Sequence, residues 1–389
     1  MMVAPKLRFK ADDGSDFPDW EDKTLGELFH ISAGGDIDKN NCAAKQSKDY
    51  PYPVYANALV NNGTYGYANY YKIDGDTFTV TGRGDVGHAV ARHCMYVPIV
   101  RLLVCQPNMD DDVDFFAEQI NYTRVFIEST GVPQLTAPQL SKIKVRRPTL
   151  PEQRKIADLL SAVDAVIATQ QVEVDAWEQR KKGVMQKLFS QEVRFKADDG
   201  SDFPKWEEKT LGKYCTQLKA SIDPRKSPNT IFAEYSMPAF DESRKARFVS
   251  GREMNSARKI LSEPCVLVNK LNVRKRRIWL VKNPEQNAVC SSEFVPLSSN
   301  AINLTFLSYF ALTDRFTSYL MDCSSGSSNS QKRVVPDVIL NYVMQIPSLP
   351  EQRKIADCLA SMDEVIQKSK DELAKWQELK KGLLQQMFM

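Results

Sequence analysis

The sequence predicts an α+β protein in which two globular domains of mixed, strand-rich structure are separated by two long helices forming an antiparallel coiled coil. Three observations support this fold class: an internal duplication, two heptad-patterned segments, and two unlike stretches with frequent turn signals. Because each half carries one copy of every repeated segment, we also expect pseudo-two-fold symmetry within the chain.

The duplication consists of two short segments that each occur twice. Arg8–Pro18 reads RFKADDGSDFP and recurs at Arg194–Pro204, 186 residues later. Leu150–Asp158 reads LPEQRKIAD and recurs at Leu349–Asp357, 199 residues later, so the second intervening stretch is 13 residues longer than the first. Such a spacing is too long for a solenoid repeat and indicates a duplicated half-protein.

These segments divide the chain into six parts. The repeats mark their edges, and the two long stretches between them do not resemble each other. We expect a repeated N-terminal segment (1–23), a first variable domain (24–147), a central spacer helix (148–190), a repeated segment (191–209), a second variable domain (210–346) and a C-terminal spacer helix (347–389).

The two spacer segments carry a coiled-coil pattern. Apolar residues alternate four and three positions apart over nearly five heptads, and Pro151 and Pro350 suit the first helical turn. Pairing within the chain favours an antiparallel arrangement; parallel pairing, or pairing between two chains, is the alternative. The predicted seam residues are Ile156, Leu160, Val163, Ile167, Val174, Trp177, Val184, Leu188, Ile355, Leu359, Met362, Ile366, Leu373, Trp376, Leu383 and Met387.

Polar residues interrupt the seam at matched places in the two helices. Gln170 corresponds to Ser369, and Lys181 corresponds to Lys380. A polar residue at a core position can fix the register of a coiled coil. The alternative is that these positions face solvent at a frayed edge.

The first variable stretch is rich in Asn, Gly and Tyr, and its Asn-Gly and Asp-Gly steps are hairpin signals. Gly82–Gly87 fits the G-x-G-x-x-G nucleotide fingerprint, but the following residues indicate a strand, whereas the fingerprint needs a helix. We therefore expect a tight turn that presents Arg83 and Asp85, or one without any contact. The acidic run Asp110–Asp114 is interpreted as a solvated loop.

The second variable stretch contains a strongly basic segment. Residues 242–282 hold 12 Lys and Arg against three Glu. Basic clusters bind phosphates, and Asn, Gln and Arg can read base edges, so this segment favours a nucleic-acid partner over a merely solvated face. By contrast, residues 24–147 hold 12 basic and 13 acidic residues, so charge does not locate a binding surface there.

Composition excludes several other classes. The chain is 42% hydrophobic and 26% charged, without the long apolar run of a membrane helix or signal peptide, so we expect a cytoplasmic protein. Its eight cysteines form no Cys-x-x-Cys pair, which suits a reducing compartment. No metal-ligand spacing, phosphate loop or catalytic constellation is recognisable, which predicts a non-catalytic binding scaffold.

The duplicated architecture resembles the DNA-specificity subunit of type I restriction–modification systems. Two unlike domains alternate with near-identical helical blocks that each open Leu-Pro-Glu-Gln, at Leu150–Gln153 and Leu349–Gln352. Gln134-Leu135, Gln139–Ser141 and Thr79–His88 also look like parts of that family's target-recognition domains. The resemblance covers essentially the whole chain.

The resemblance implies a role and partners. Each variable domain is expected to be a target-recognition domain that reads one half of a bipartite, asymmetric site in double-stranded DNA, while the helices set the gap. Two modification subunits that carry S-adenosylmethionine are expected to dock on the subunit, and restriction subunits are expected to join them. The chain itself is expected to hold no cofactor or metal.

Candidate contact residues follow from these considerations. Apolar residues outside the seam, Leu159 and Val166, are the candidate partner-binding positions. Two alternatives remain: a fused DNA methyltransferase, disfavoured by the missing cofactor and catalytic motifs, and a structural coiled-coil adaptor, disfavoured by the basic segment. The candidate DNA-binding residues are Asn57, Asn61, Asn62, Tyr65, Arg83, Asp85, Gln134, Lys270, Asn272, Arg274, Lys275, Arg276, Asn329, Gln331, Lys332 and Arg333.

Overall fold

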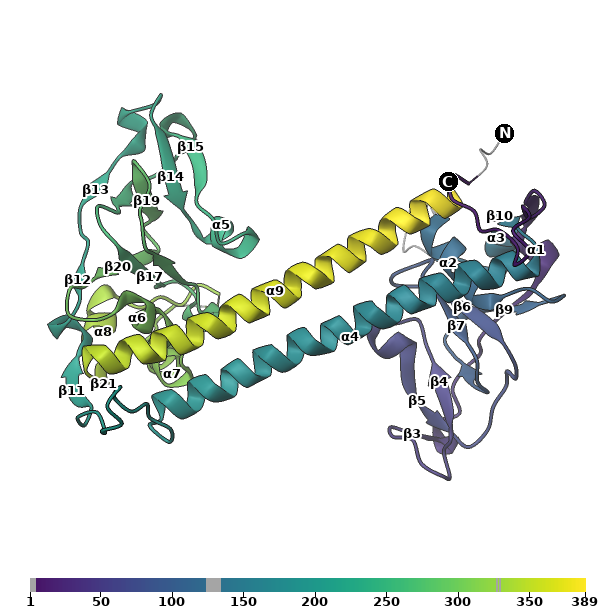
Figure 1. Cartoon of the computed structure of the whole chain (residues 1–389), viewed down its shortest axis with the longest axis horizontal. Coiled ribbons are helices and arrows are strands. Elements are labelled where there is room, and N and C mark those ends of the chain that lie inside the picture. Colours follow the sequence, from purple (N-terminus) through teal and green to yellow (C-terminus); the bar gives the residue numbers. More distant parts are fainter. Residues whose placement is uncertain (1–4, 124–133, 327, 329) are drawn as a thin grey trace. The chain divides into compact units, whose positions relative to one another are not determined.

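The computed structural model describes residues 5–123, 134–326, 328 and 330–389. The chain divides into two compact units, Met1–Val172 with Asp371–Met389, and Glu173–Lys370. Each unit contains one variable domain and a part of each long helix (Figure 1). None of the helices within the described ranges is long and apolar enough to cross a bilayer.

The two long helices are α4 (Leu150–Phe189) and α9 (Leu349–Phe388), each of 40 residues. In the first unit Asp164 of α4 pairs with Lys380 of α9 at 2.8 Å, and in the second unit Lys181 of α4 pairs with Asp363 of α9 at 2.5 Å. Early residues of one helix thus meet late residues of the other, which confirms the antiparallel pairing. All sixteen predicted seam residues are buried or half-buried.

The lysines in the seam are ion-paired inside it. Lys181 lies 4.8 Å from the ring centroid of Tyr309, whose hydroxyl donates to Asp363 at 2.6 Å. Lys380 donates to Asp164 at 2.8 Å and to Glu118 at 2.9 Å. The alternative in which these two positions face solvent therefore does not hold. Asp164 and Asp363 are themselves 199 residues apart, so the two cross-helix pairs are copies of each other.

The two repeated segments of the first half are contact partners, which explains why they recur together. Glu152, at the start of α4, is fully buried and accepts from Arg8 Nε at 3.0 Å and Arg8 Nη2 at 2.8 Å. Trp20 Nε1 donates to the same carboxylate at 3.0 Å. Arg8 Nη2 also donates to the Pro18 carbonyl at 2.6 Å, so one guanidinium joins the N-terminal segment to the helix.

The second half repeats this constellation almost atom for atom. Buried Glu351 accepts from Arg194 Nε at 3.0 Å, from Arg194 Nη2 at 2.8 Å and from Trp206 Nε1 at 3.1 Å. The neighbouring glutamines, Gln153 and Gln352, are buried as well and donate to the carbonyls of Pro148 and Pro347, both at 2.9 Å. The repeated sequence thus fixes the segment that precedes each variable domain onto a long helix, and we call this set of contacts the seat of the domain.

The described residues of the first domain include two four-stranded sheets. One has the order β2-β9-β6-β7 and is covered by α2; the other has the order β3-β5-β4-β8, in which β4 and β8 are parallel. A separate pair, β1 and β10, adjoins the start of α4 in sequence. The elements are β1 (Glu21–Thr24), α1 (Leu25–Leu28), β2 (Phe29–Ala33), β3 (Cys42–Ala43), β4 (Tyr52–Tyr55), β5 (Thr64–Ala68), β6 (Thr77–Val80), β7 (Ala89–Arg92), β8 (Val97–Pro98), β9 (Leu103–Pro107), α2 (Val113–Thr123), α3 (Ala137–Ser141) and β10 (Lys144–Arg147).

The second domain repeats the first of these sheets with unrelated sequence, whereas its other sheet has five strands in a different order. Its sheets have the orders β12-β20-β17-β18 and β13-β16-β19-β14-β15, and β14 and β19 are again the parallel pair. The elements are β11 (Glu207–Thr210), β12 (Thr216–Gln217), β13 (Ser221–Ile222), β14 (Ile231–Tyr235), α5 (Met237–Glu242), β15 (Arg247–Ser250), β16 (Arg258–Ile260), β17 (Cys265–Asn269), β18 (Ile278–Val281), β19 (Ala288–Ser291), β20 (Phe294–Ser298), α6 (Leu304–Phe310), α7 (Asp314–Asp322), α8 (Pro336–Leu340) and β21 (Val343–Ile346).

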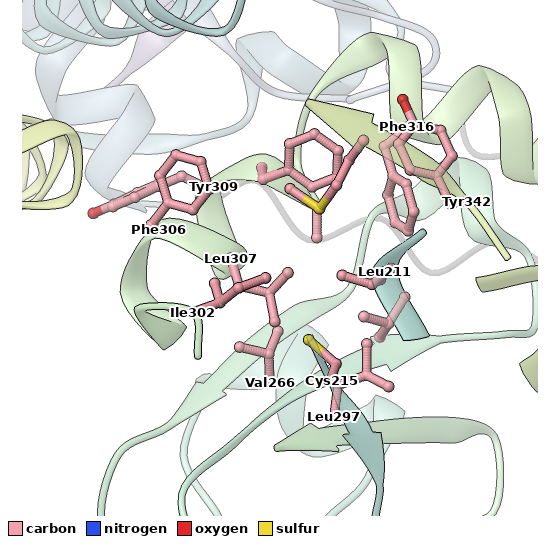
Figure 2. Packing of buried hydrophobic residues seen from close by; sticks show 14 of the residues in the cluster. Leu211, Cys215, Val266, Leu297, Ile302, Phe306, Leu307, Tyr309, Phe316 and Tyr342 are labelled. Atoms are coloured by element: carbon pink, nitrogen blue, oxygen red, sulfur yellow. The ribbon is translucent and has the colours of Figure 1, made fainter. Parts of the chain in front are cut away.

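The largest buried apolar cluster of the second unit combines side chains from a sheet, the short helices and both long helices. Figure 2 shows Val266 and Leu297 of the sheet facing Leu307 and Ile302, with the rings of Phe316 and Tyr342 nearby. Leu188 of α4 and Ile355 of α9 belong to the same buried cluster. Since burial of apolar surface stabilises a fold by about 25 cal/mol per Å², this cluster helps to hold the sheet and both long helices together.

The acidic run of the first domain is not the solvated loop that we expected. Asp111 is buried and pairs with Arg147 Nε at 2.8 Å, while Gln153 Nε2 donates to it at 2.9 Å. Asp112 accepts from the Phe115 backbone N–H at 2.9 Å, at the start of α2. These carboxylates therefore join α2 to β10 and α4, a use that charge counting along the sequence does not distinguish from solvation.

Candidate nucleic-acid interface

The two motifs that the sequence singled out occupy the same hairpin in the two domains. The glycine-rich turn connects β6 to β7, and the basic cluster connects β17 to β18, each hairpin lying at the edge of an equivalent sheet. The segment before α3 or α8 crosses each hairpin: Leu135 N–H donates to the Gly82 carbonyl at 2.9 Å, and Val334 N–H donates to the Lys270 carbonyl at 3.0 Å. Leu135 and Val334 are 199 residues apart, which fixes the equivalence of the two hairpins.

In the first domain the hairpin presents both of its predicted residues. Arg83 and Asp85 are exposed, and Arg83 Nη2 donates to Gln134 Oε1 at 3.3 Å. β7 follows the turn directly, so no helix N-terminus is available for a nucleotide phosphate, as predicted. Gly82 is required, because a Cβ there would lie 2.9 Å from the Leu135 carbonyl oxygen.

The asparagine-rich segment lies beside this hairpin. Asn61 and Asn62 are exposed and have left-handed backbones, with φ of 51° and 50°. The Asn62 carbonyl accepts from the buried Arg92 guanidinium at 2.7 Å, and Arg92 in turn lies over the Tyr55 ring at 3.7 Å. Tyr65, on β5, is 60% exposed.

In the second domain the structure separates the basic cluster into structural and exposed cations. Arg277 is buried and forms a bidentate pair with Asp241 at 2.7 and 2.6 Å, which holds the pKa of Asp241 below its usual value. Arg276 pairs with Asp314 at 2.5 Å and donates to the Leu312 carbonyl at 3.1 Å. These two guanidinium groups are thus already engaged within the protein.

Arg274 and Lys275 point out of the same hairpin. Both are exposed, and among the described residues neither has a carboxylate within ion-pair distance. Asn272, Arg274 and Lys332 line a cavity of about 120 Å³ together with Ser324. The structure therefore brings together the 270–277 cluster and the 324–333 loop, which the sequence had marked separately.

Three further predicted residues, Lys270, Gln331 and Arg333, belong to the same hairpin and loop but do not line this cavity. Lys270 is half-buried, and Arg333 pairs with Glu293 at 3.2 Å. The Gln331 N–H donates to the Ser328 carbonyl at 3.0 Å. Asn329 lies outside the described residues.

Sequence reasoning did not single out several exposed side chains. Phe248, on the sheet-edge strand β15, is 69% exposed and follows the exposed cations Arg244, Lys245 and Arg247. Arg101 of the first domain is exposed and left-handed, with φ of 60°. The high charge density of residues 242–282 was a signal for the former group, whereas nothing in the local sequence marks Arg101.

The candidate partner positions differ from each other. Leu159 is half-buried against the core of the first unit, whereas Val166 is 38% exposed. Each unit also has a cavity beside its seam lysine, of about 680 Å³ at Lys181 and about 970 Å³ at Lys380. Repeat-equivalent residues line the two cavities: Lys181, Lys182, Met185, Gln186 and Phe189 in one, and Lys380, Lys381, Leu384, Gln385 and Phe388 in the other.

Comparison with known proteins agrees with this architecture. Residues 18–175 match the model of the type I restriction modification DNA specificity domain. The specificity subunit of the type I restriction enzyme MjaVIII from Methanocaldococcus jannaschii is 25% identical over an alignment of 301 residues, which covers 71% of this chain and 69% of that protein. The specificity subunit of the type I restriction enzyme HindI from Haemophilus influenzae is 21% identical over 42% of this chain and 36% of that protein.

Solved structures share the fold along the full length. The S subunit of a type I restriction–modification system from M. genitalium superposes with a TM-score of 0.65 at 15% identity, covering 100% of this chain and 99% of that one. Its likeness extends to both variable domains and both long helices, in keeping with the duplicated sequence. Residues 18–175 thus match the DNA specificity domain of type I restriction–modification systems, and the chain as a whole is similar to the specificity subunits of such systems.

Proposed function

We propose that the chain reads a bipartite site in double-stranded DNA, each variable domain reading one half through its β6–β7 or β17–β18 hairpin. The observation that carries this proposal is the equivalence of the two hairpins. Residues singled out for unrelated reasons, a glycine-rich turn and a basic cluster, occupy the same place, crossed by the same backbone hydrogen bond. Exposed Arg83 in one hairpin, and Arg274 with Lys275 in the other, suit phosphates and base edges.

The long helices have two roles in this proposal. They set the gap between the half-sites, and they carry the docking positions for two modification subunits. Twin cavities lined by repeat-equivalent residues support the second role, because two like sites suit two copies of one partner. Val166 is the exposed candidate position on α4.

The chemistry is assigned to the partners. In this proposal methyl transfer from S-adenosylmethionine belongs to the modification subunits, and any DNA cleavage belongs to restriction subunits. The purified chain should then bind no S-adenosylmethionine, whereas its complex with the modification subunit should bind it. Binding by the chain alone would favour a fused methyltransferase.

The test of DNA reading is a selection from a randomised library of duplex DNA. The full chain with its modification subunit should enrich a motif of two fixed halves around an unspecified gap. A structural coiled-coil adaptor would enrich none. The matched control is the double variant Arg274→Ala/Lys275→Ala, which should weaken one half-motif only.

The gap is tested by lengthening both helices. Four residues inserted after Val174 and four after Leu373, which are equivalent positions of the antiparallel helices, add about 6 Å to each helix. Since base pairs are spaced by about 3.4 Å, the gap should grow by one or two base pairs while both half-motifs stay the same. An active variant that retains the original gap would show that the helices do not set it.

A further inference from the structure

Three loops of the first domain meet at one side chain, Asn57. Its Nδ2 donates to the Val100 carbonyl at 2.6 Å, and its Oδ1 accepts from the Gly82 N–H at 2.7 Å. Asn57 thereby ties its own segment to the glycine-rich turn and to the segment before β9. Both polar atoms of its amide thus bind within the protein. Asn57, which the sequence analysis named as a candidate DNA contact, instead holds the three loops together.

The joined loops have unusual backbones. Val100 and Arg101 are left-handed in succession, with φ of 54° and 60°, as are Asn61 and Asn62. A β-branched residue in this region is a genuine outlier, because its Cβ crowds the following carbonyl. Such strain persists only where the surroundings impose it, and it concentrates at functional sites.

The three loops display side chains suited to a DNA groove. Arg83 and Arg101 are exposed, and neither forms an ion pair among the described residues. Beside them Leu59, Val60 and Val100 are 45%, 76% and 48% exposed. Guanidinium groups bind phosphates or guanine edges, and aliphatic side chains contact thymine methyl groups. Two exposed arginines without a carboxylate partner among the described residues favour duplex DNA over a protein partner as the occupant.

We propose that this three-loop surface, made of Leu59–Asn62, Arg83–Asp85 and Val100–Arg101, is the base-contacting surface of the first domain, with Arg101 as a specificity-determining residue. The proposal rests on the proposed function and locates the surface that the balanced charge of residues 24–147 does not reveal. The Gly82 turn lies at the position of the basic hairpin of the second domain, which supports the same use.

The experiment uses the full chain with its modification subunit and the randomised duplex library. Arg101→Gly should relieve the left-handed strain, because glycine adopts positive φ readily, and so should retain or raise the thermal midpoint. It should nevertheless relax one or two base positions of a single half-motif and weaken binding to the wild-type motif about tenfold or more. Arg83→Ala should affect the same half-motif, and the Arg274→Ala/Lys275→Ala variant the other.

The matched control is Gln191→Gly, which removes another left-handed backbone strain, at φ of 62°, from the turn after α4. It should leave the selected motif unchanged. Arg101→Lys, which retains the charge but not the planar fork, should lose the same base preference as Arg101→Gly. If the wild type selects a bipartite motif that neither Arg101→Gly nor Arg83→Ala alters, this surface is not the reader. If the wild type selects no motif, the proposed function itself fails.

Discussion

The β6–β7 hairpin of the first domain and the β17–β18 hairpin of the second share a position but are held in different ways. The turn of the first carries one arginine and one aspartate, Arg83 and Asp85. It is held by Asn57 of another loop, which accepts from the Gly82 N–H, and by its own Thr81, which accepts from the His88 N–H. The second is basic. Its own Asn269 is buried, accepts from the Arg277 N–H at 3.0 Å and donates to the Leu271 carbonyl at 2.9 Å, while Asp241 and Asp314 of other segments pair with its arginines. Topology therefore fixes where such a hairpin lies, whereas each domain has its own side chains for holding it.

The seats of the domains on the helices show the opposite behaviour. There the two halves use identical residue types with distances that agree within about 0.1 Å for the arginine and tryptophan contacts to Glu152 and Glu351. Identical seats suit a duplicated framework that carries two divergent domains. The side chains of a hairpin can then differ between the domains while the contacts to the long helices stay the same.

The largest expected effect tests the equality of the seats. Glu152→Ala and Glu351→Ala should each lower the free energy of unfolding of their own unit by about 3–5 kcal/mol, because each leaves a partly buried guanidinium and an indole N–H without their acceptor. Denaturant unfolding followed by tryptophan fluorescence measures both. Clearly unequal losses would contradict the equivalence of the two seats; Asp19→Ala, at an exposed carboxylate near Arg8, is the control and should cost little.

Replacing the two seam lysines, in contrast, should lower the free energy of unfolding by unequal amounts. Lys380→Met leaves two carboxylates without their cation, Glu118 and Asp164, and Glu118 is mostly buried, with a side chain 18% exposed. Lys181→Met leaves only Asp363, which is 46% exposed and still accepts from Tyr309. We expect losses of about 2–3 kcal/mol and about 1 kcal/mol respectively.

The control for this comparison removes the extra carboxylate. In a Glu118→Gln background, Lys380→Met should cost about as much as Lys181→Met does in the wild type. Denaturant unfolding of the four variants decides the point. Equal costs already in the wild-type background would show that Glu118 contributes nothing to the difference.

The sequence predicted the framework well because its signals are local and repeated. Heptad spacing gave the seam, and identity between Leu150–Asp158 and Leu349–Asp357 gave the symmetry. The seat itself was not predicted, since nothing in a single sequence says that Arg8 reaches Glu152, 144 residues away. The prediction for the acidic run was wrong for the same reason. Sequence alone does not distinguish a solvated aspartate from Asp111, whose partners Arg147 and Gln153 lie far along the chain.

For the candidate interface, charge density along the sequence indicated the hairpin of the second domain but did not indicate any surface in the first domain. Within the basic cluster the sequence could not separate Arg276 and Arg277, whose partners Asp314 and Asp241 lie 38 and 36 residues away, from the exposed Arg274 and Lys275. Arg101 was missed because left-handed geometry at a non-glycine residue depends on tertiary contacts, here the hydrogen bond from Asn57 to Val100.

The division of the basic cluster into exposed and internally paired cations predicts two different effects, one on DNA binding and one on stability. Arg274→Ala/Lys275→Ala should reduce the slope of log affinity against log salt by about 1.8, since each lost phosphate contact accounts for about 0.9, while the thermal midpoint is unchanged. Arg277→Ala should instead lower the free energy of unfolding by about 1–3 kcal/mol, because it breaks a partly buried bidentate pair. A salt slope unchanged in the double variant would show that these two cations do not face phosphates.

The smallest expected effect concerns pH, and again it separates the domains, because all three histidines of the chain lie in the first one. His93 bridges two carboxylates, with Nδ1 2.9 Å from Asp76 and Nε2 2.9 Å from Asp114. Partial burial lowers the pKa of His93, but hydrogen bonds and charges from Asp76 and Asp114 outweigh it, so the pKa is raised above its ordinary value. A raised folded-state pKa means that the charged form stabilises the fold. That contribution is fully present below the unfolded pKa of about 6.5 and is lost as the pH rises through the raised value. Solvent screening keeps this contribution small, since the side chain is 52% exposed.

Denaturant unfolding of the wild type and His93→Gln at several pH values should therefore show a difference in the first unit that shrinks with rising pH, and none in the second. A difference that grows with pH would mean that burial, and not the two carboxylates, dominates the titration of His93.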